Sequence, residues 1–281
     1  MTPQKTVADI IGMKKKGEKI TVLTAFDASF ARMLEQSGVD IILVGDSLGM
    51  VALGYDSTVP VTMADMLHHS KAVRRGAPQT IVVGDMPFMS YQISIDRAIA
   101  NAGRFMKEAG CDAVKLEGGQ DMAETVRAIV TAGIPVMGHI GLTPQTAGKL
   151  GGFKVQGKDI ESARKLLVDA KSLDDAGAFA VVLECIPDQL AQVISKEISI
   201  PTIGIGAGVG CDGQVLVTHD LLGMFEKFVP RFVKCYRHLA PEIKEALGSF
   251  KDEVRTGKFP DSEHSFTMNY DAAELLGRFC E

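Results

Sequence analysis

Three acidic residues stand where short apolar runs of the sequence end. Asp46 follows one run, Asp85 lies 39 residues further on, and Glu117 another 32. These intervals are typical of consecutive strand–helix units, and in a parallel barrel the carboxyl ends of all strands meet at one mouth. Three carboxylates there would repel one another unless a hard cation such as Mg²⁺ lay between them. We therefore predict all three as Mg²⁺ ligands, although any one alone would be better explained as a helix cap or a solvated loop acid.

Lys115, His139 and Glu184 close further runs of the same kind. Lys115 and Glu117 alternate along one predicted strand and point to the same face, so Lys115 either pairs with Glu117 or offers a fixed cation to a substrate carboxylate. Burial of Glu184 would raise its pKa and make it a general base near neutral pH, unless a salt bridge gives it a structural role. His139 is compatible with a metal ligand, an acid or base, or a hydrogen-bonded barrel histidine.

A glycine-rich turn and a cysteine are weaker candidates. Gly204, Gly206 and Gly208 follow a predicted strand. They could hold a phosphate, form a dinucleotide fingerprint, or let the backbone of a tight turn approach a ligand. The fingerprint also needs an acid at a strand end about twenty residues later, and none is found there. Cys185 adjoins Glu184, but free cysteine is mostly a small buried hydrophobe, so we interpret it as a spectator thiol.

The elements that must position these residues alternate in type. Short β-branched runs alternate with segments of helical period, several of which end in glycine. Eight such strands predict an α/β fold, a parallel (β/α)8 TIM barrel rather than an open sheet. The predicted strands are Ile20–Phe26, Asp40–Gly45, Thr80–Gly84, Ala113–Leu116, Pro135–His139, Phe179–Leu183, Pro201–Ile205 and Gln214–Val217, and the predicted helices between them are Ala28–Gln36, Met63–Arg75, Ile93–Glu108, Met122–Thr131, Ile160–Ala176 and Asp188–Lys196.

Helical segments also flank the predicted barrel. We predict an extra helix at Thr6–Lys16, inside an N-terminal segment 1–19, and two more at Val229–Leu239 and Pro241–Val254. The tail 261–281 is polar and then helix-like. No linker or internal repeat divides the sequence, so residues 1–281 are expected to form one barrel domain with appended termini.

The composition excludes several classes of protein. Of 281 residues, 46% are hydrophobic, and thirty basic against thirty-five acidic residues give a net charge of −5, which argues against a nucleic-acid binder. The richest apolar stretch, Val39–Leu53, is broken by Asp46, so no membrane span is predicted. Five scattered cysteines without a C-x-x-C pair favour reduced thiols in a cytoplasmic protein over a disulfide frame or a zinc site.

Ten short motifs complete the sequence pattern. They are VGDSLGM (44–50), YDST (55–58), VT (61–62), AVRRG (72–76), DMPFMSY (85–91), VKLEGG (114–119), GHIGLTPQ (138–145), LECIP (183–187), GIGAG (204–208) and DGQ (212–214). Together they resemble the ketopantoate hydroxymethyltransferase family. The resemblance runs from Thr6 to Phe266 and says nothing about residues 267–281.

The resemblance implies an enzyme of pantothenate biosynthesis. It would transfer a hydroxymethyl group from 5,10-methylenetetrahydrofolate to 3-methyl-2-oxobutanoate through a Mg²⁺-stabilised enolate, giving 2-dehydropantoate. It also implies a barrel that assembles as a homodecamer of two stacked pentameric rings and acts on small molecules. Carried over residue by residue, the resemblance implies that Mg²⁺ would be surrounded by Asp46, Asp85 and Glu117. The keto acid would be contacted by Asp46, Ser47, Asp85 and Lys115. Glu184 would be the base, and His139 is a candidate helper in proton transfer.

Two other functions stay open at this point. The phosphoenolpyruvate mutase and isocitrate lyase group also binds 2-oxo acids at a Mg²⁺ barrel mouth, but its lyases use a cysteine-bearing loop, and no cysteine occurs in Leu142–Val155. A catalytically inert barrel that binds a metabolite would keep the acids yet show no metal-dependent proton exchange.

Overall fold

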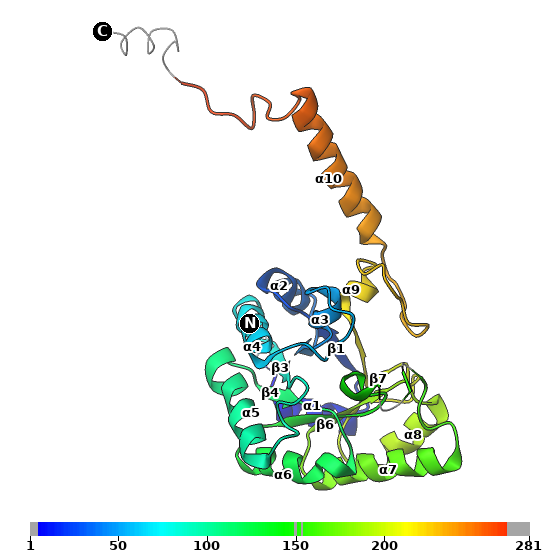
Figure 1. The fold of residues 1–281 in the computed structure, drawn as a ribbon. Coiled ribbons are helices and arrows are strands. Elements are labelled where there is room, and N and C mark those ends of the chain that lie inside the picture. Colours follow the sequence, from blue (N-terminus) through cyan, green and yellow to red (C-terminus); the bar gives the residue numbers. More distant parts are fainter. Residues whose placement is uncertain (1–4, 149–150, 153, 269–281) are drawn as a thin grey trace.

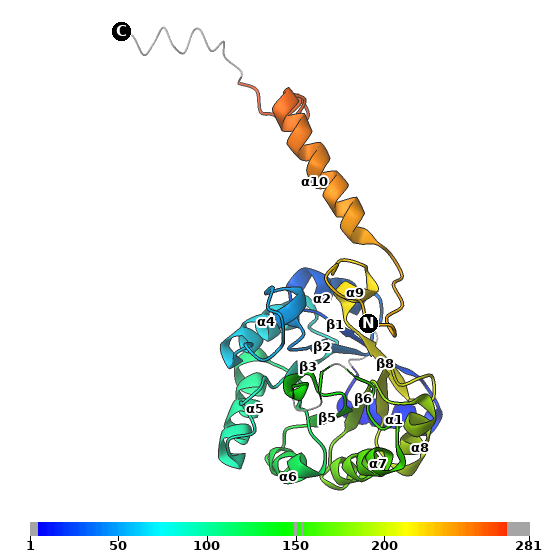
Figure 2. The same ribbon diagram turned by 45° about the vertical axis from the view of Figure 1, so that its right-hand side comes forward.

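The computed structural model describes residues 5–148, 151–152 and 154–268. Within these ranges eight parallel strands close into a barrel, in chain order from β1 to β8, and helices surround it (Figures 1 and 2). The closing seam pairs Ile20 of β1 with Gly213 of β8. The predicted barrel is thus confirmed. Its strands are β1 (Ile20–Thr24), β2 (Ile41–Val44), β3 (Ile81–Asp85), β4 (Ala113–Lys115), β5 (Val136–Gly141), β6 (Ala180–Glu184), β7 (Thr202–Ile205) and β8 (Gly213–Leu216).

Local signals in the sequence set where the helices begin and end. Thr6 and Thr62 each form a capping box with the aspartate three residues later, and Gly110 ends a helix with a left-handed φ of 68°. The helices are α1 (Val7–Lys16), α2 (Ala28–Gln36), α3 (Leu48–Val51), α4 (Met63–Gly76), α5 (Ile95–Ala109), α6 (Ala123–Thr131), α7 (Ile160–Asp175), α8 (Asp188–Glu197), α9 (Thr218–Leu221) and α10 (Leu239–Thr256), with 3-10 turns η1 (Gln120–Met122) and η2 (Pro144–Thr146).

Alternation along each strand divides the core into two layers. On β2, Ile41 and Leu43 face the barrel interior, whereas Ile42 and Val44 pack against the surrounding helices. Helix α1 contributes Ile10 to the interior layer, so it covers the amino ends of the strands. The mouth at the carboxyl ends is therefore the open end of the barrel, which a TIM barrel uses for ligands.

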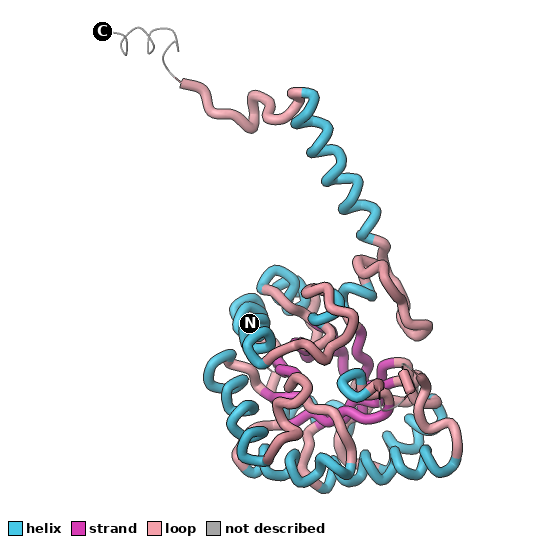
Figure 3. The backbone as a smooth tube through the Cα atoms, viewed as in Figure 1, coloured by secondary structure: helices cyan, strands magenta, loops and turns pink. Residues whose placement is uncertain are grey.

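The helix predicted at Val229–Leu239 is wrong. That segment is irregular and runs from α9 to α10 (Figure 3). Pro230 disfavours helical backbone at Val229. The Tyr236 and Leu239 amides instead donate to the carbonyls of Leu221 and Leu222, so contacts with the end of α9 replace the intrahelical bonds.

Helix α10 leaves the barrel and projects away from it (Figures 1 and 2). Of the tail predicted as helix-like, residues 261–268 form no helix, and 269–281 lie outside the described residues. In the part of the chain that the structure describes, no helix is both long and apolar enough to cross a membrane.

Candidate active site

The interior-facing strand positions place the chemical groups at the barrel mouth. Asp85, Lys115 and Glu184 are the last residues of β3, β4 and β6, and His139 lies on β5. Each of the four side chains points to the interior face of its strand. Lys115, for example, lies two residues after Ala113, which belongs to the interior layer. These four side chains line one cavity of about 350 Å³, together with Asp46, Ser47 and Glu117. Every site residue predicted from the sequence is therefore brought to one place.

A buried ion pair forms the floor of the cavity. The Lys115 ammonium donates to both carboxylate oxygens of Asp85, at 2.8 and 2.9 Å, and lies 3.8 Å from Glu117 Oε1. Burial alone would lower the pKa of Lys115, but the charges of Asp85, Glu117 and Asp46 outweigh it and raise that pKa. Lys115 is therefore a permanent cation, and it pairs with Asp85 more closely than with the Glu117 partner considered from the sequence.

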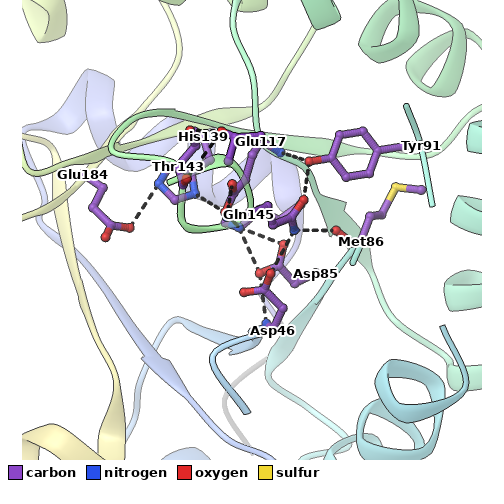
Figure 4. A network of polar contacts seen from close by, with 11 residues as sticks. Asp46, Asp85, Met86, Tyr91, Glu117, His139, Thr143, Gln145 and Glu184 are labelled. Atoms are coloured by element: carbon purple, nitrogen blue, oxygen red, sulfur yellow. Dashed lines mark hydrogen bonds and ion pairs between the residues drawn. The ribbon is translucent and has the colours of Figure 1, made fainter. Parts of the chain in front are cut away.

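Asp46 and Glu117 are held by a polar network that the sequence did not reveal (Figure 4). Gln145 donates from Nε2 to Asp46 Oδ2 and to the Met86 carbonyl, both at 2.9 Å, and from its backbone amide to Glu117 Oε2 at 3.1 Å. The Tyr91 hydroxyl donates to Gln145 Oε1 at 2.6 Å and accepts from the Glu117 amide at 3.1 Å. Gln145 and Tyr91 both lie in motifs noted above, but an uncharged loop glutamine and a tyrosine gave no chemical signal.

The two network acids are strongly perturbed. Burial, followed by repulsion from Asp85, raises the pKa of Asp46 to about 7, and burial raises the pKa of Glu117 well above its ordinary value. Glu117 Oε1 has no hydrogen-bond partner within the described ranges. Both acids thus hold a proton more readily than an exposed carboxyl group, because burial and the neighbouring acids outweigh the attraction of Lys115.

His139 lies between two carboxylates. Its Nε2 is 3.2 Å from Glu184 Oε2 and its Nδ1 is 3.5 Å from Glu117 Oε1, although neither contact has the angles of a hydrogen bond. Burial, with a contribution from Lys115, lowers the pKa of His139, so the ring is neutral near pH 7. Glu184 keeps 14% of its side chain exposed and faces the cavity.

The predicted metal ligands share the cavity without forming a ready-made cage. Across the described ranges, no three His, Cys, Asp or Glu side chains are arranged to hold a metal ion. Lys115 occupies both oxygens of Asp85, while Gln145 holds one oxygen of Asp46 and one of Glu117. The donor set nevertheless suits Mg²⁺, because it consists of three carboxyl groups in one cavity, one of them with an unpartnered buried oxygen. Ser47, at the N-terminus of α3, makes no capping bond and lines the same cavity.

The glycine turn and Cys185 have structural explanations. A Cβ at Gly206 would lie 2.8 Å from the Phe232 ring, and one at Gly208 would lie 2.4 Å from Asp188 Cβ. Close packing of protein groups therefore accounts for these two glycines. Burial raises the pKa of the Cys185 thiol to about 12, which agrees with a spectator thiol.

Comparison with known proteins gives one family over most of the chain. The family model described as ketopantoate hydroxymethyltransferase matches residues 4–262. A protein of Desulfotalea psychrophila named 3-methyl-2-oxobutanoate hydroxymethyltransferase is 62% identical over 97% of this chain and 98% of its own length. Proteins with the same name from Syntrophus aciditrophicus and Carboxydothermus hydrogenoformans are 59% and 60% identical over 93% and 97% of this chain, and 96% and 98% of their own lengths.

Solved structures share the fold at low identity. A phosphonopyruvate hydrolase in complex with oxalate and Mg²⁺ has a TM-score of 0.59 at 12% identity, and a phosphoenolpyruvate phosphomutase from Streptomyces platensis subsp. rosaceus has 0.61 at 15%. Each match covers 98% of this chain and 96% of the other. At this identity the likeness concerns the barrel architecture alone.

Proposed function

The chain belongs to the ketopantoate hydroxymethyltransferase family, and on that premise we propose how its barrel mouth works. The enzyme transfers a hydroxymethyl group to 3-methyl-2-oxobutanoate and gives 2-dehydropantoate, with 5,10-methylenetetrahydrofolate as the one-carbon donor. One arrangement carries the proposal: Glu184 faces the cavity from β6, while Lys115 and the Asp46–Asp85–Glu117 acids lie in the same cavity on neighbouring strands and loops.

Lys115 and Ser47 hold the keto acid in this proposal. The buried ammonium supplies a fixed positive charge from β4, and the hydroxyl of Ser47 donates a hydrogen bond from the loop that follows β2. The Lys115–Asp85 pair keeps that charge at one position, because both carboxylate oxygens accept from it. A fixed cation stabilises charge that develops on the substrate without reorganisation at the moment of reaction.

Glu184 removes the proton from the carbon next to the ketone. The proton moves to the carboxylate, and the resulting enolate carbon attacks the one-carbon unit. Water adds to that unit and both of its C–N bonds to the folate break, so that tetrahydrofolate leaves with the two hydrogens of the water on its nitrogens and the unit reacts as formaldehyde. The new alkoxide takes the proton back from Glu184 and becomes the hydroxyl group. His139 is neutral and its Nε2 lies 3.2 Å from Glu184 Oε2, so a small turn of either side chain brings the ring into hydrogen-bonding geometry and lets it help in moving the proton. A positioned general base of this kind contributes about 10²–10⁴-fold in rate.

Mg²⁺ would be held by Asp46, Asp85 and Glu117. When bound, the ion supplies Lewis-acid polarisation of the keto acid. The chain's own contribution is to concentrate negative charge: Gln145 and Tyr91 fix Asp46 and Glu117 in place, and the unpartnered oxygen of Glu117 remains available. Without a cation, burial and then repulsion from the neighbouring acids raise the pKa values of Asp46 and Glu117.

The test is hydrogen exchange at the reacting carbon of 3-methyl-2-oxobutanoate in D₂O, followed by NMR. The unmodified protein with Mg²⁺ is compared with EDTA-treated protein, with Glu184→Gln and with Glu18→Gln. Glu18 is an exposed glutamate just before β1, at the end of the barrel remote from the mouth, and serves as the matched control. Each protein is measured with and without the folate donor.

Exchange that needs both Mg²⁺ and Glu184, and is unchanged in Glu18→Gln, supports the proposed roles. We expect Glu184→Gln to lower the exchange rate by about 10²-fold or more. Exchange that persists in Glu184→Gln would remove Glu184 as the base. If the unmodified protein gave no exchange and no product, even with the folate donor, that result would favour the inert metabolite-binding barrel.

Self-association as a homodecamer of two stacked pentamers is a further part of the proposal. Ile243, Leu247, Phe250 and Val254 form an apolar stripe on α10 and are 42–64% exposed in the single chain. Such a stripe on a projecting helix suits contact with a second copy. Light scattering of the unmodified protein and of Leu247→Ser tests this, since a monomer in both cases contradicts it. We also propose a cytoplasmic setting, which rests on the scattered cysteines of the sequence.

A further inference from the structure

The cavity at the barrel mouth extends well beyond the acids. Its volume of about 350 Å³ falls in the range of pockets that hold drug-sized ligands, about 300–1,000 Å³, and greatly exceeds what a small keto acid fills. The side near β8 is lined by Thr24, Val215, Asp220, Phe225 and Phe232. None of these residues has a part in binding or deprotonating the keto acid as described above.

Asp220 is a buried carboxylate with an unused acceptor. Its side chain lines the cavity, the residue is 9% exposed, and Oδ1 has no hydrogen-bond partner in the described part of the chain. Burial raises the pKa of Asp220 to about 6, so the group is mostly ionised near pH 7. Asp40, a buried acid with a structural role, differs because its Oδ2 accepts from the Thr21 amide and hydroxyl at 2.8 and 2.7 Å. A buried charge without a partner is costly and suits a ligand that donates to it.

The backbone holds Asp220 in place. The Thr218 amide donates to Thr24 Oγ1 at 3.0 Å, and the Thr218 hydroxyl donates to the Thr24 carbonyl at 2.5 Å. The next residue, His219, stacks on Phe26 with ring centroids 5.5 Å apart. These contacts tie α9 to the end of β1, so the carboxylate faces the cavity from a rigid element.

Aromatic and basic residues complete this side of the cavity. Phe225, Phe228 and Phe232 line it, and the Phe232 ring rests on Gly206, where a Cβ would lie 2.8 Å away. The exposed residues Lys154 and Arg231 line the same cavity and bring positive charge to its rim. A flat heteroaromatic ring with N–H donors at one end and an anionic tail at the other matches this combination of groups.

We propose that Asp220 binds the pterin ring of the one-carbon donor by accepting its ring N–H and its exocyclic amino group. The ring then lies against the phenylalanines, and the anionic tail leaves past Lys154 and Arg231. This inference rests on the proposed function for the identity of the donor. It assigns the two substrates to opposite sides of one cavity, with the keto acid at the acids and the pterin near β8.

The test compares Asp220→Asn with the unmodified protein and with Glu18→Gln. Binding of tetrahydrofolate is measured by calorimetry, and KM is measured for both substrates. We expect Asp220→Asn to weaken tetrahydrofolate binding and to raise the KM for the folate donor at least tenfold. The KM for the keto acid and the rate of its deuterium exchange should stay within about twofold of the unmodified protein. The reason is that Asp220→Asn removes only the pair of hydrogen bonds between the carboxylate and the pterin.

A second measurement includes a comparison that needs only the unmodified protein. A tetrahydropterin that lacks the exocyclic amino group should bind the unmodified protein at least tenfold more weakly than its parent, and the two should bind Asp220→Asn nearly equally. Equal binding of both compounds to the unmodified protein would overturn the inference, as would unchanged tetrahydrofolate affinity in folded Asp220→Asn. Absence of proton exchange and transfer in the unmodified protein would instead count against the proposed function, while the binding measurements still decide the role of Asp220.

Discussion

Replacing Tyr91 with phenylalanine removes one buried oxygen from the polar network at the mouth. The Tyr91 hydroxyl donates to Gln145 Oε1 and accepts from the Glu117 amide, and the residue is 2% exposed. The space left by a single oxygen is too small to admit a water that would replace both bonds. Each orphaned buried group costs about 1–3 kcal/mol, so Tyr91→Phe should lower the free energy of unfolding by about 2–6 kcal/mol.

The same change should also reduce activity. Gln145 holds Asp46 through its side chain and Glu117 through its backbone amide, and its side-chain amide loses one of the three hydrogen bonds that hold it in place. A loosened Gln145 no longer keeps the two acids at one spacing. We therefore expect slower deuterium exchange at saturating keto acid, with a larger effect on kcat than on KM.

Chemical denaturation measures how much the free energy of unfolding falls in Tyr91→Phe. The protein concentration is kept fixed, because self-association would otherwise shift the apparent stability. Tyr55→Phe is the matched control, since Tyr55 is 38% exposed and its hydroxyl takes part in no hydrogen bond of the described chain. The control should change stability by no more than about 0.5 kcal/mol. Equal, small effects in both variants would refute the reasoning that the Tyr91 hydroxyl satisfies two buried groups.

Three further changes test other parts of the structure. Gly84→Ala places a Cβ 2.3 Å from the buried Phe105 ring and should cost about 1–3 kcal/mol or more in thermal or chemical unfolding; unchanged stability contradicts that packing. Lys115→Met leaves the Asp85 charge uncompensated and should cost about 3–5 kcal/mol and abolish exchange, whereas near-normal exchange would remove Lys115 from the mechanism. Asp220→Asn should gain stability at pH 8. A carboxyl whose pKa is raised on folding, from 3.8 to about 6, loses stability as pH rises through that window. The gain should reach about 1–3 kcal/mol at pH 8 and vanish near pH 3, so an equal gain at both pH values contradicts it.

The barrel and most of its site followed from local patterns. Strand and helix signals act over a few neighbouring residues, so all eight strands lie within one or two residues of the predicted bounds. Period-two alternation then puts Asp85, Lys115, His139 and Glu184 on the interior side, because each continues a line of interior residues along its own strand. The convergence of the acids needed only the rule that parallel strands end at one mouth.

What the tertiary structure alone decided depends on contacts between distant segments. Tyr91 and Gln145 are 54 residues apart and Gln145 and Asp46 are 99 apart, so no local period signals that they touch. The segment Val229–Leu239 has helical periodicity, yet bonds to the end of α9 and packing of Phe232 on Gly206 give it another course. Asp220 looks like an ordinary short-helix acid in the sequence. Only its burial against the cavity, without a partner for Oδ1 in the described residues, distinguishes it, because the free-energy cost of a buried charge arises from the surrounding fold.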